Sequence, residues 1–342
     1  MLLFKQRSNI RTGLGVYPMG WGFLIFTCGF FSGIACVACL ARPAFWRETA
    51  PASGKKVVRK SGEWSRFSRA AIQFRCALVT LFRSYGEHHL SNFRDQIGGI
   101  DSIQVDGKDV ILVACDDVYF DRFAVPLLQS MNQLPETFVT HIHLMRPSSA
   151  TIDAVTRLGD SLNNIQVSYT TDACNAAFPG NLDYIYYAAG RFLVAPYLLE
   201  RGARRILAID VDSTMIKSPW PIIDGLPQEM TVGFVFREDK KNAWQKILAN
   251  AVLLKNDLSA KTFSNRFARA LLVNLGRRQR FCVDQIVPYY LVRLSSSAIR
   301  SRIRGLPANI MAVGKTDDAA FWTVKGRAKW QTSSPDQALI TA

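Results

Sequence analysis

From about residue 109 onward, the hydrophobic pattern alternates between strand-like and helix-like segments. Short, nearly continuous apolar runs are typical of strands that are buried on both faces of a sheet, and amphipathic segments between them are typical of covering helices. The expected strands are 110–114, 138–145, 165–169, 205–209, 231–236 and 250–254, and the expected helices are 121–132, 148–162, 186–199 and 259–275. This alternation predicts an α/β domain in which helices cover both faces of a parallel sheet.

The first part of the chain has a different pattern. Residues 20–40 form an apolar stretch without a charged residue, and about 20 such residues can span a bilayer. A signal peptide is the alternative, since small residues near Ala41 resemble a cleavage site. The apolar part of a signal peptide is usually only ~7–15 residues long. We therefore expect a retained transmembrane helix at 20–40 after an N-terminal segment at 1–19.

Basic residues flank this apolar stretch, and more of them follow it than precede it. Because basic flanks tend to stay in the cytoplasm, the bias predicts a single-pass membrane protein whose main domain is cytoplasmic. Residues 41–105 are expected to form a basic linker and stem, in which 64–95 predicts a helix or a helix pair. That stem either packs on the domain or lies on anionic lipid headgroups. The main domain is expected at 106–335.

The composition indicates a folded protein with anionic partners. Of the 342 residues, 49% are hydrophobic and 20% are charged, which excludes a largely disordered chain. The formal net charge of +15 favours acidic lipid or phosphorylated ligands. We expect no nucleic acid partner, since the sequence has neither zinc-finger spacing nor the aromatic-basic alternation of base-stacking modules. The seven cysteines are dispersed and odd in number, which predicts reduced thiols.

The most informative segment is the expected strand at 205–209, because it ends in Asp210-Val211-Asp212. Side chains two residues apart in an extended chain point to the same face, so the two carboxylates can converge where the strand leaves the core. Paired carboxylate oxygens suit a divalent cation that holds phosphates, and open α/β sheets bind ligands at the carboxyl ends of their strands. The motif therefore predicts a metal and phosphate site at this edge.

Five further segments combine residue types that suit nucleotide, phosphate or sugar binding. They are 114–119 (ACDDVY), 187–192 (YAAGRF), 250–251 (NA), 284–285 (DQ) and 325–330 (KGRAKW). Together with the D-x-D motif and in this order, they resemble the family 8 retaining glycosyltransferases over about residues 110–330. The resemblance implies the GT-A fold, a Rossmann-like α/β fold for nucleotide-diphosphosugars. It also implies transfer of a hexose from a nucleotide sugar, UDP-linked, to a glycan or lipid-linked acceptor hydroxyl with retained anomeric configuration.

The resemblance assigns five residues to the nucleotide. Asp116 and Tyr119 match residues of this family that contact the base and the ribose. Arg191 matches an arginine that reaches the diphosphate, and the planar guanidinium suits this role because it pairs two phosphate oxygens at once. Gly326 and Lys329 match a closing segment in which the glycine lets the backbone approach the phosphates and the lysine neutralises them.

The resemblance also assigns the reaction centre. The D-x-D pair would bind Mn²⁺ or Mg²⁺, Asn250 and Ala251 would touch the donor sugar, and Asp284 with Gln285 would face the anomeric carbon. Thr323 departs from the family, because it stands where a metal-ligating histidine is expected. Since a hydroxyl is a poorer ligand than imidazole, the affinity for the metal is expected to be lower.

Two other functions fit part of the pattern. Residues 210–214 match the D-x-D-x-T motif of haloacid-dehalogenase-type phosphatases, whose first aspartate is a nucleophile, and 315–318 could supply a lysine and an acidic pair. That family carries its motif on the first strand, whereas here several strands and helices precede it, so we rank this function lower. The change at Thr323 also leaves open a non-catalytic domain that binds a nucleotide sugar.

Overall fold

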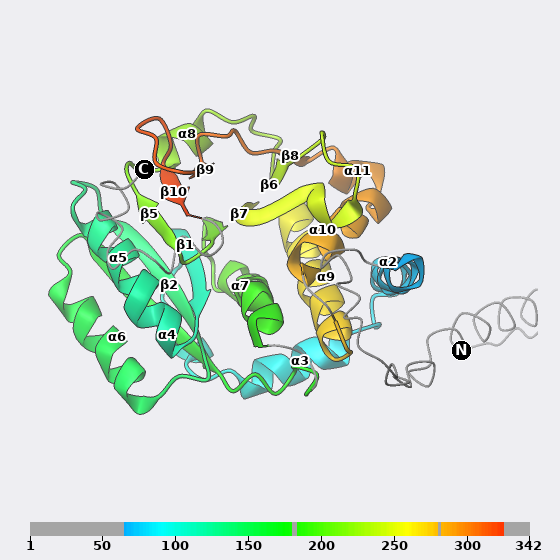
Figure 1. Ribbon diagram of the computed structural model, residues 1–342, viewed down its shortest axis with the longest axis horizontal. Coiled ribbons are helices and arrows are strands. Elements are labelled where there is room, and N and C mark those ends of the chain that lie inside the picture. Colours follow the sequence, from blue (N-terminus) through cyan, green and yellow to red (C-terminus); the bar gives the residue numbers. More distant parts are fainter. Residues whose placement is uncertain (1–64, 180–182, 280–281, 325–342) are drawn as a thin grey trace, which may run out of the picture. The chain divides into compact units, whose positions relative to one another are not determined.

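The computed structural model describes residues 65–179, 183–279 and 282–324 (Figure 1). The chain divides into two compact units, 1–63 and 64–342, and all described residues belong to the second. The expected transmembrane helix at 20–40 and the expected nucleotide ligands Gly326 and Lys329 lie outside the described residues. Within the described ranges, none of the helices combines the length and the apolar character needed to cross a bilayer.

A seven-stranded mixed sheet in the order β3-β2-β1-β4-β7-β6-β8 forms the centre of the second unit. Its strands are β1 (Asp109–Cys115), β2 (Phe138–Met145), β3 (Ile165–Asp172), β4 (Arg205–Ile209), β6 (Val232–Phe236), β7 (Ile247–Lys255) and β8 (Ile303–Gly305). Strands β3, β2, β1 and β4 are parallel neighbours, as predicted. The expectation of a parallel sheet is wrong at β7, which runs antiparallel to both β4 and β6. The connection 237–246 between β6 and β7 is short, which explains their antiparallel pairing, because parallel neighbours need a crossover of a dozen or more residues.

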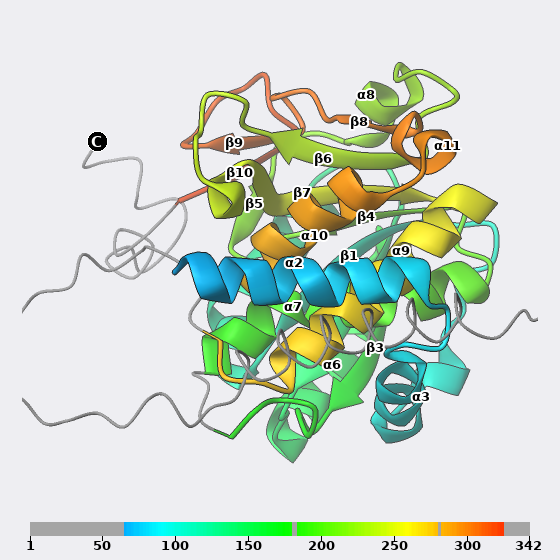
Figure 2. The same cartoon turned by 90° about the vertical axis from the view of Figure 1, so that its right-hand side faces the viewer.

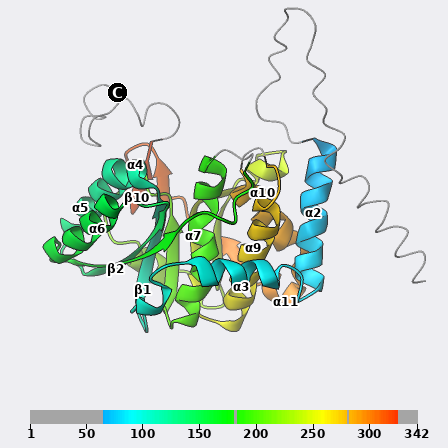
Figure 3. The same ribbon diagram turned by 90° about the horizontal axis from the view of Figure 1, so that it is seen from below.

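Helices cover both faces of this sheet (Figures 1 and 3). One face carries α4 (Asp117–Tyr119), a π-helical turn (Phe120–Ala124), α5 (Val125–Asn132) and α6 (Ser149–Ser161), and the other carries α7 (Asp183–Glu200), α9 (Leu258–Leu275) and α10 (Val283–Leu294). Side chains of β1 alternate between the two resulting cores, with Val110 and Leu112 in one and Ile111 and Val113 in the other. A strand buried on both faces is apolar throughout, which is why the sequence located it.

The remaining elements frame the sheet. They are α2 (Arg66–Leu81), α3 (Glu87–Gln96), a 3₁₀ turn (Ile100–Ser102), α8 (Trp220–Asp224), a second 3₁₀ turn (Ala243–Gln245), α11 (Ser297–Arg300), and a small sheet of β5 (Ser213–Met215), β10 (Phe321–Thr323) and β9 (Met311–Val313). The expected helix pair at 64–95 is present as α2 and α3, which pack on α9, with α2 also on α10 (Figure 2). The stem therefore packs on the domain, while Phe67 and Leu81 of α2 remain exposed.

Helix α7 packs on β1 and β2, and Gly190 lies at this contact. A Cβ atom at this position would lie 2.7 Å from Met145 Sδ and 3.3 Å from His143 Cδ2. A larger residue would therefore require the Met145 side chain to move. Because Arg191 is the next residue, this close contact also determines where its guanidinium reaches the sheet.

A buried polar network joins β2 to β3 through two histidines. His141 Nδ1 lies 2.9 Å from Ser168 Oγ, and its Nε2 lies 3.0 Å from Thr170 Oγ1. His143 Nδ1 lies 2.9 Å from the same threonine hydroxyl, and its Nε2 lies 3.5 Å from Asp172 Oδ2. Both rings are fully buried.

This network predicts a loss of stability in acid. Burial, and next the neighbouring His143, lower the pKa of His141 from 6.5 to about 3. Between these values the unfolded chain binds a proton that the folded chain excludes, so the free energy of unfolding falls with decreasing pH by up to about 1.4 kcal/mol per pH unit. Urea unfolding between pH 7.5 and pH 5 measures this slope. His141→Asn is expected to flatten it, and His88→Asn, which replaces an exposed ring, is the control. An equal slope in all three proteins would contradict the assignment.

Candidate functional site

A cavity of about 340 Å³ lies at the carboxyl edge of the sheet, where β4 and β6 end and β7 begins. It is lined by Asp210, Arg237, Leu248, Ala249, Asn250, Asp284, Gln285 and Val313. Four of these, Asp210, Asn250, Asp284 and Gln285, are site residues predicted from the sequence. They come from β4, β7 and α10, which are distant along the chain but adjacent in the fold. Open α/β sheets bind ligands at this edge.

Backbone and amide contacts hold the walls of this cavity together. The amide N–H of Asp210 donates to the carbonyl of Asn250 over 3.1 Å, which ties the end of β4 to β7. Asp284 is buried in the first turn of α10. In the orientation that satisfies its neighbours, the Gln285 amide nitrogen donates to the carbonyls of Trp244, at 2.9 Å, and Ile247, at 3.3 Å. The amino end of α10 is thereby attached to the start of β7.

Arg191 forms a buried ion pair with the first aspartate of the D-x-D motif. Its Nη2 lies 2.8 Å from Asp210 Oδ1 and 2.6 Å from the carbonyl oxygen of Ala249. The guanidinium carbon also lies 4.5 Å from the centre of the Phe192 ring. Arg191 is 4% exposed and does not line the cavity. The contact with a diphosphate stays a prediction, and in this structure the side chain orients Asp210.

Thr323 lies beside the second aspartate of the motif. Its hydroxyl donates to the backbone carbonyl of Asp212 over 2.8 Å and lies 3.4 Å from Asp212 Oδ1. The pairing of β10 with β5 brings this about, because Thr323 is opposite Ser213 in the antiparallel register. The Ser213 hydroxyl in turn donates to the carbonyl of Asp210 over 2.7 Å. The residue identified as a replacement for a metal-binding histidine is therefore adjacent to the predicted metal pair.

Asp116 and Tyr119 are at the same edge of the sheet but outside this cavity. They follow β1, which runs parallel to β4, so both strands end on the same side. The Asp116 carboxylate accepts from the amide of Tyr119 over 2.9 Å and caps α4. Ala251 is also outside the cavity, since it is fully buried within β7 opposite Ile209. Its side chain is therefore part of the core.

The sequence analysis did not identify Arg237, which adds a cation to a cavity that holds two carboxylates. Its amide donates to the carbonyl of Lys246 over 2.8 Å, which fixes the backbone just after β6. The signal that could have found it is the one that identified Asp210, a polar side chain directly after a buried strand.

The atoms around the D-x-D motif are suitable ligands for a hard cation. No group of three or more histidine, cysteine, aspartate or glutamate side chains in the described ranges is placed to hold a metal. Mg²⁺ is often bound by only one or two carboxylates, with waters and substrate phosphates as the other ligands. The carboxylates of Asp210 and Asp212 fit a cation bound in that way, whereas the Thr323 hydroxyl is buried and bonded to the Asp212 carbonyl.

No protein-family model and no curated protein matches this sequence. Solved structures with a related chain path include the bifunctional glycosyltransferase WbbM, with 11% identity over 66% of this chain and 46% of that chain and a TM-score of 0.45. The galactosyltransferase LgtC, in complex with donor and acceptor sugar analogues, has 16% identity over 64% of this chain and 88% of its own, with a TM-score of 0.45. Mouse xyloside xylosyltransferase 1 has 13% identity over 60% of this chain and 87% of its own, with a TM-score of 0.40. The chain thus spans about half of WbbM.

Proposed function

We propose that this chain is a glycosyltransferase that moves a hexose from a nucleotide sugar, UDP-linked, to an acceptor hydroxyl with retained anomeric configuration. One observation carries the proposal: residues assigned to the metal, the donor sugar and the reaction centre from separate parts of the sequence share a single cavity. They are Asp210, Asn250, Asp284 and Gln285. The cavity also lies at the edge of the sheet where nucleotides bind in α/β proteins.

The charges of the cavity suit the two halves of such a donor. The guanidinium of Arg237 can pair with diphosphate oxygens. The buried carboxylate of Asp284 creates a negative potential, which stabilises the positive charge that develops on the anomeric carbon as its bond to the diphosphate breaks. The Gln285 amide is held by the carbonyls of Trp244 and Ile247, so its dipole keeps a fixed direction during the reaction.

We further propose that Mn²⁺ or Mg²⁺ binds here through the carboxylates of Asp210 and Asp212, with an affinity lowered by Thr323 in place of histidine. When bound, such a cation neutralises the charge of the departing nucleoside diphosphate. Arg191 keeps the Asp210 carboxylate in one orientation, and Thr323 stabilises the turn that carries Asp212. Both residues would therefore position the ligands before the donor arrives.

Release of UDP tests the proposal. The full-length protein in detergent is incubated with a panel of UDP-sugars and Mn²⁺, and UDP and free or transferred sugar are quantified. UDP release that requires the cation supports the transferase. Release of phosphate from a phosphomonoester would instead support the phosphatase, although residues 315–318 do not line the cavity. Thermal stabilisation by UDP without turnover would support a binding domain that lacks activity.

We also propose that residues 20–40 anchor the protein in the membrane as a single-pass helix with a cytoplasmic main domain, because this stretch is apolar and charge-free. The full-length chain is expected to stay in the membrane pellet after alkaline carbonate extraction, and a variant without residues 1–40 is expected to move to the supernatant. Protease added to right-side-out vesicles should leave the main domain intact. Extraction of the full-length chain, or its digestion in intact vesicles, would contradict the anchor or its orientation.

A further inference from the structure

A second cavity, of about 460 Å³, lies at the opposite edge of the sheet, where β4 begins and β7 ends. It is lined by Arg204, Arg205, Gln228, Thr231, Lys255, Asn256, Asp257 and Arg302. It shares no lining residue with the cavity at the carboxyl edge. Its volume is within the range of about 300–1,000 Å³ that is usual for small-molecule pockets, and half of its lining residues are basic.

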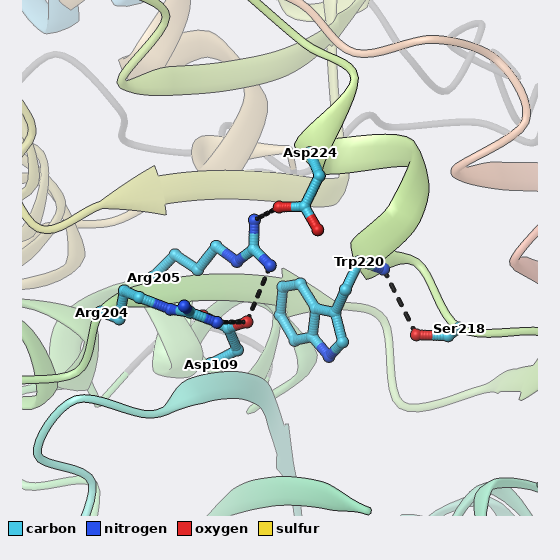
Figure 4. Close-up of polar contacts among 6 residues, drawn as sticks. All are labelled: Asp109, Arg204, Arg205, Ser218, Trp220 and Asp224. Atoms are coloured by element: carbon cyan, nitrogen blue, oxygen red, sulfur yellow. Dashed lines mark hydrogen bonds and ion pairs between the residues drawn. The ribbon is translucent and has the colours of Figure 1, made fainter. Parts of the chain in front are cut away.

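Arg205 is held rigidly in the wall of this cavity (Figure 4). Its Nη1 lies 2.5 Å from Asp224 Oδ1 and its Nη2 lies 2.8 Å from Asp109 Oδ2, so the guanidinium extends between the two carboxylates. The ring of Trp220 lies 4.8 Å from the guanidinium carbon. Arg205 is 8% exposed, and within the described ranges its Nε has no hydrogen-bond partner. The guanidinium of Arg205 therefore already has a fixed position in the folded protein before a ligand binds.

The basic residues of the cavity differ in how their charge is balanced. Arg204 also pairs with Asp109, at 2.5 Å, and Arg302 pairs with Asp257, at 3.1 Å. Among the described residues Lys255 has no ion pair, although Asp224, Asp257 and Glu229 attract it from a distance. Burial, and next the repulsion by Arg205, lower the pKa of Lys255. An anion bound beside the Lys255 ammonium would offset its repulsion by Arg205.

The cavity wall also contains a hydroxyl that the protein leaves unsatisfied. Thr231 is 4% exposed, and its Oγ1 has no hydrogen-bond partner among the described residues. A buried hydroxyl without a partner is unfavourable by about 1–3 kcal/mol, and a bound water or ion is one explanation for such a group. The amide nitrogen of the neighbouring Asn256 is different, since it donates to the carbonyls of Leu199 and Ala203 and only completes the wall.

We propose that this second cavity binds a small molecule through a phosphate group, with Lys255 and Thr231 as its principal contacts. Phosphate suits the arrangement better than carboxylate, because its three or four oxygens can accept from donors on several elements, here the ends of β4 and β7 and the segment before β6. The cavity is larger than a phosphate ion requires, so it has room for the rest of a phosphate ester. This site is separate from the proposed donor site and does not depend on its function.

Titration calorimetry of the full-length protein with inorganic phosphate, at constant ionic strength and without metal, tests the proposal. Lys255→Met keeps the length of the side chain but removes the charge, and it is expected to lower the affinity about 10-fold or more. Thr231→Val keeps the shape but removes the hydroxyl, and it is expected to lower the affinity by a similar factor with an unchanged or higher melting temperature. Lys261→Met, on the exposed side of α9, makes the same charge change outside the cavity.

The outcomes separate the sources of phosphate and the two cavities. If glycerol 3-phosphate binds more tightly than inorganic phosphate, the ligand is a phosphate ester. If the two affinities are equal, the ligand is the free ion. Both results support the site. Arg237→Gln changes the carboxyl-edge cavity and should not alter this binding. The proposal is overturned if phosphate gives no saturable heat, if acetate binds as tightly, or if Thr231→Val and Lys255→Met bind phosphate like the parent protein.

Discussion

Asp212→Asn is expected to lower the turnover of a nucleotide sugar by about 100- to 1,000-fold. The substitution removes one of two negative charges that would hold the cation against the diphosphate. It preserves the local structure, because the asparagine oxygen can still lie near the Thr323 hydroxyl and the backbone carbonyl still accepts from it. The loss of turnover should appear in kcat for UDP release. It should become only slightly smaller as the concentration of Mn²⁺ is raised.

A surface variant provides the control for this measurement. Asp160→Asn makes the same change at an exposed position of α6, which packs on β3 and does not line the cavity, and should leave turnover unaltered. Both variants are first compared with the parent by thermal unfolding. If Asp212→Asn folds normally and keeps its turnover, a cation held by the D-x-D pair does not assist the departure of the diphosphate.

Arg191→Met is expected to lower the free energy of unfolding by about 3 kcal/mol, near the lower end of the values for a broken buried ion pair. The methionine removes the guanidinium that pairs with the Asp210 carboxylate and donates to the Ala249 carbonyl. The lower end applies because the Asp210 side chain is 24% exposed and water can compensate in part. Urea unfolding measures the change.

Two further variants distinguish an orienting arginine from one that only contacts a ligand. Asp210→Asn combined with Arg191→Met should recover part of the lost stability, since no buried charge is then left alone. Arg146→Met breaks the exposed pair with Asp183 and should lower stability by only about 0–1 kcal/mol. An Arg191→Met protein as stable as the parent would show that the ion pair contributes nothing to the fold.

The local hydrophobic pattern was sufficient to predict an element where that element's own residues determine its burial. The strands at 138–145 and 205–209 were predicted with the boundaries that the structure has, because strands buried on both faces are mostly apolar. The placement of Asp210 at the end of β4 follows from the same pattern. Helix α10 was not predicted as an element, although Asp284 and Gln285 were identified, because Pro288 and the apolar run after it do not resemble an amphipathic surface helix.

The amino-acid sequence by itself therefore determined the layered α/β architecture, the strand that ends in two carboxylates and half of the residues that line the first cavity. Only the tertiary structure decided the antiparallel direction of β7, the pairing of Arg191 with Asp210 and the gathering of Lys255 and Thr231 in a second cavity. The physical reason is that periodicity reports whether a residue is buried. Which distant side chains meet depends on sheet order and register, and both are results of packing the whole chain.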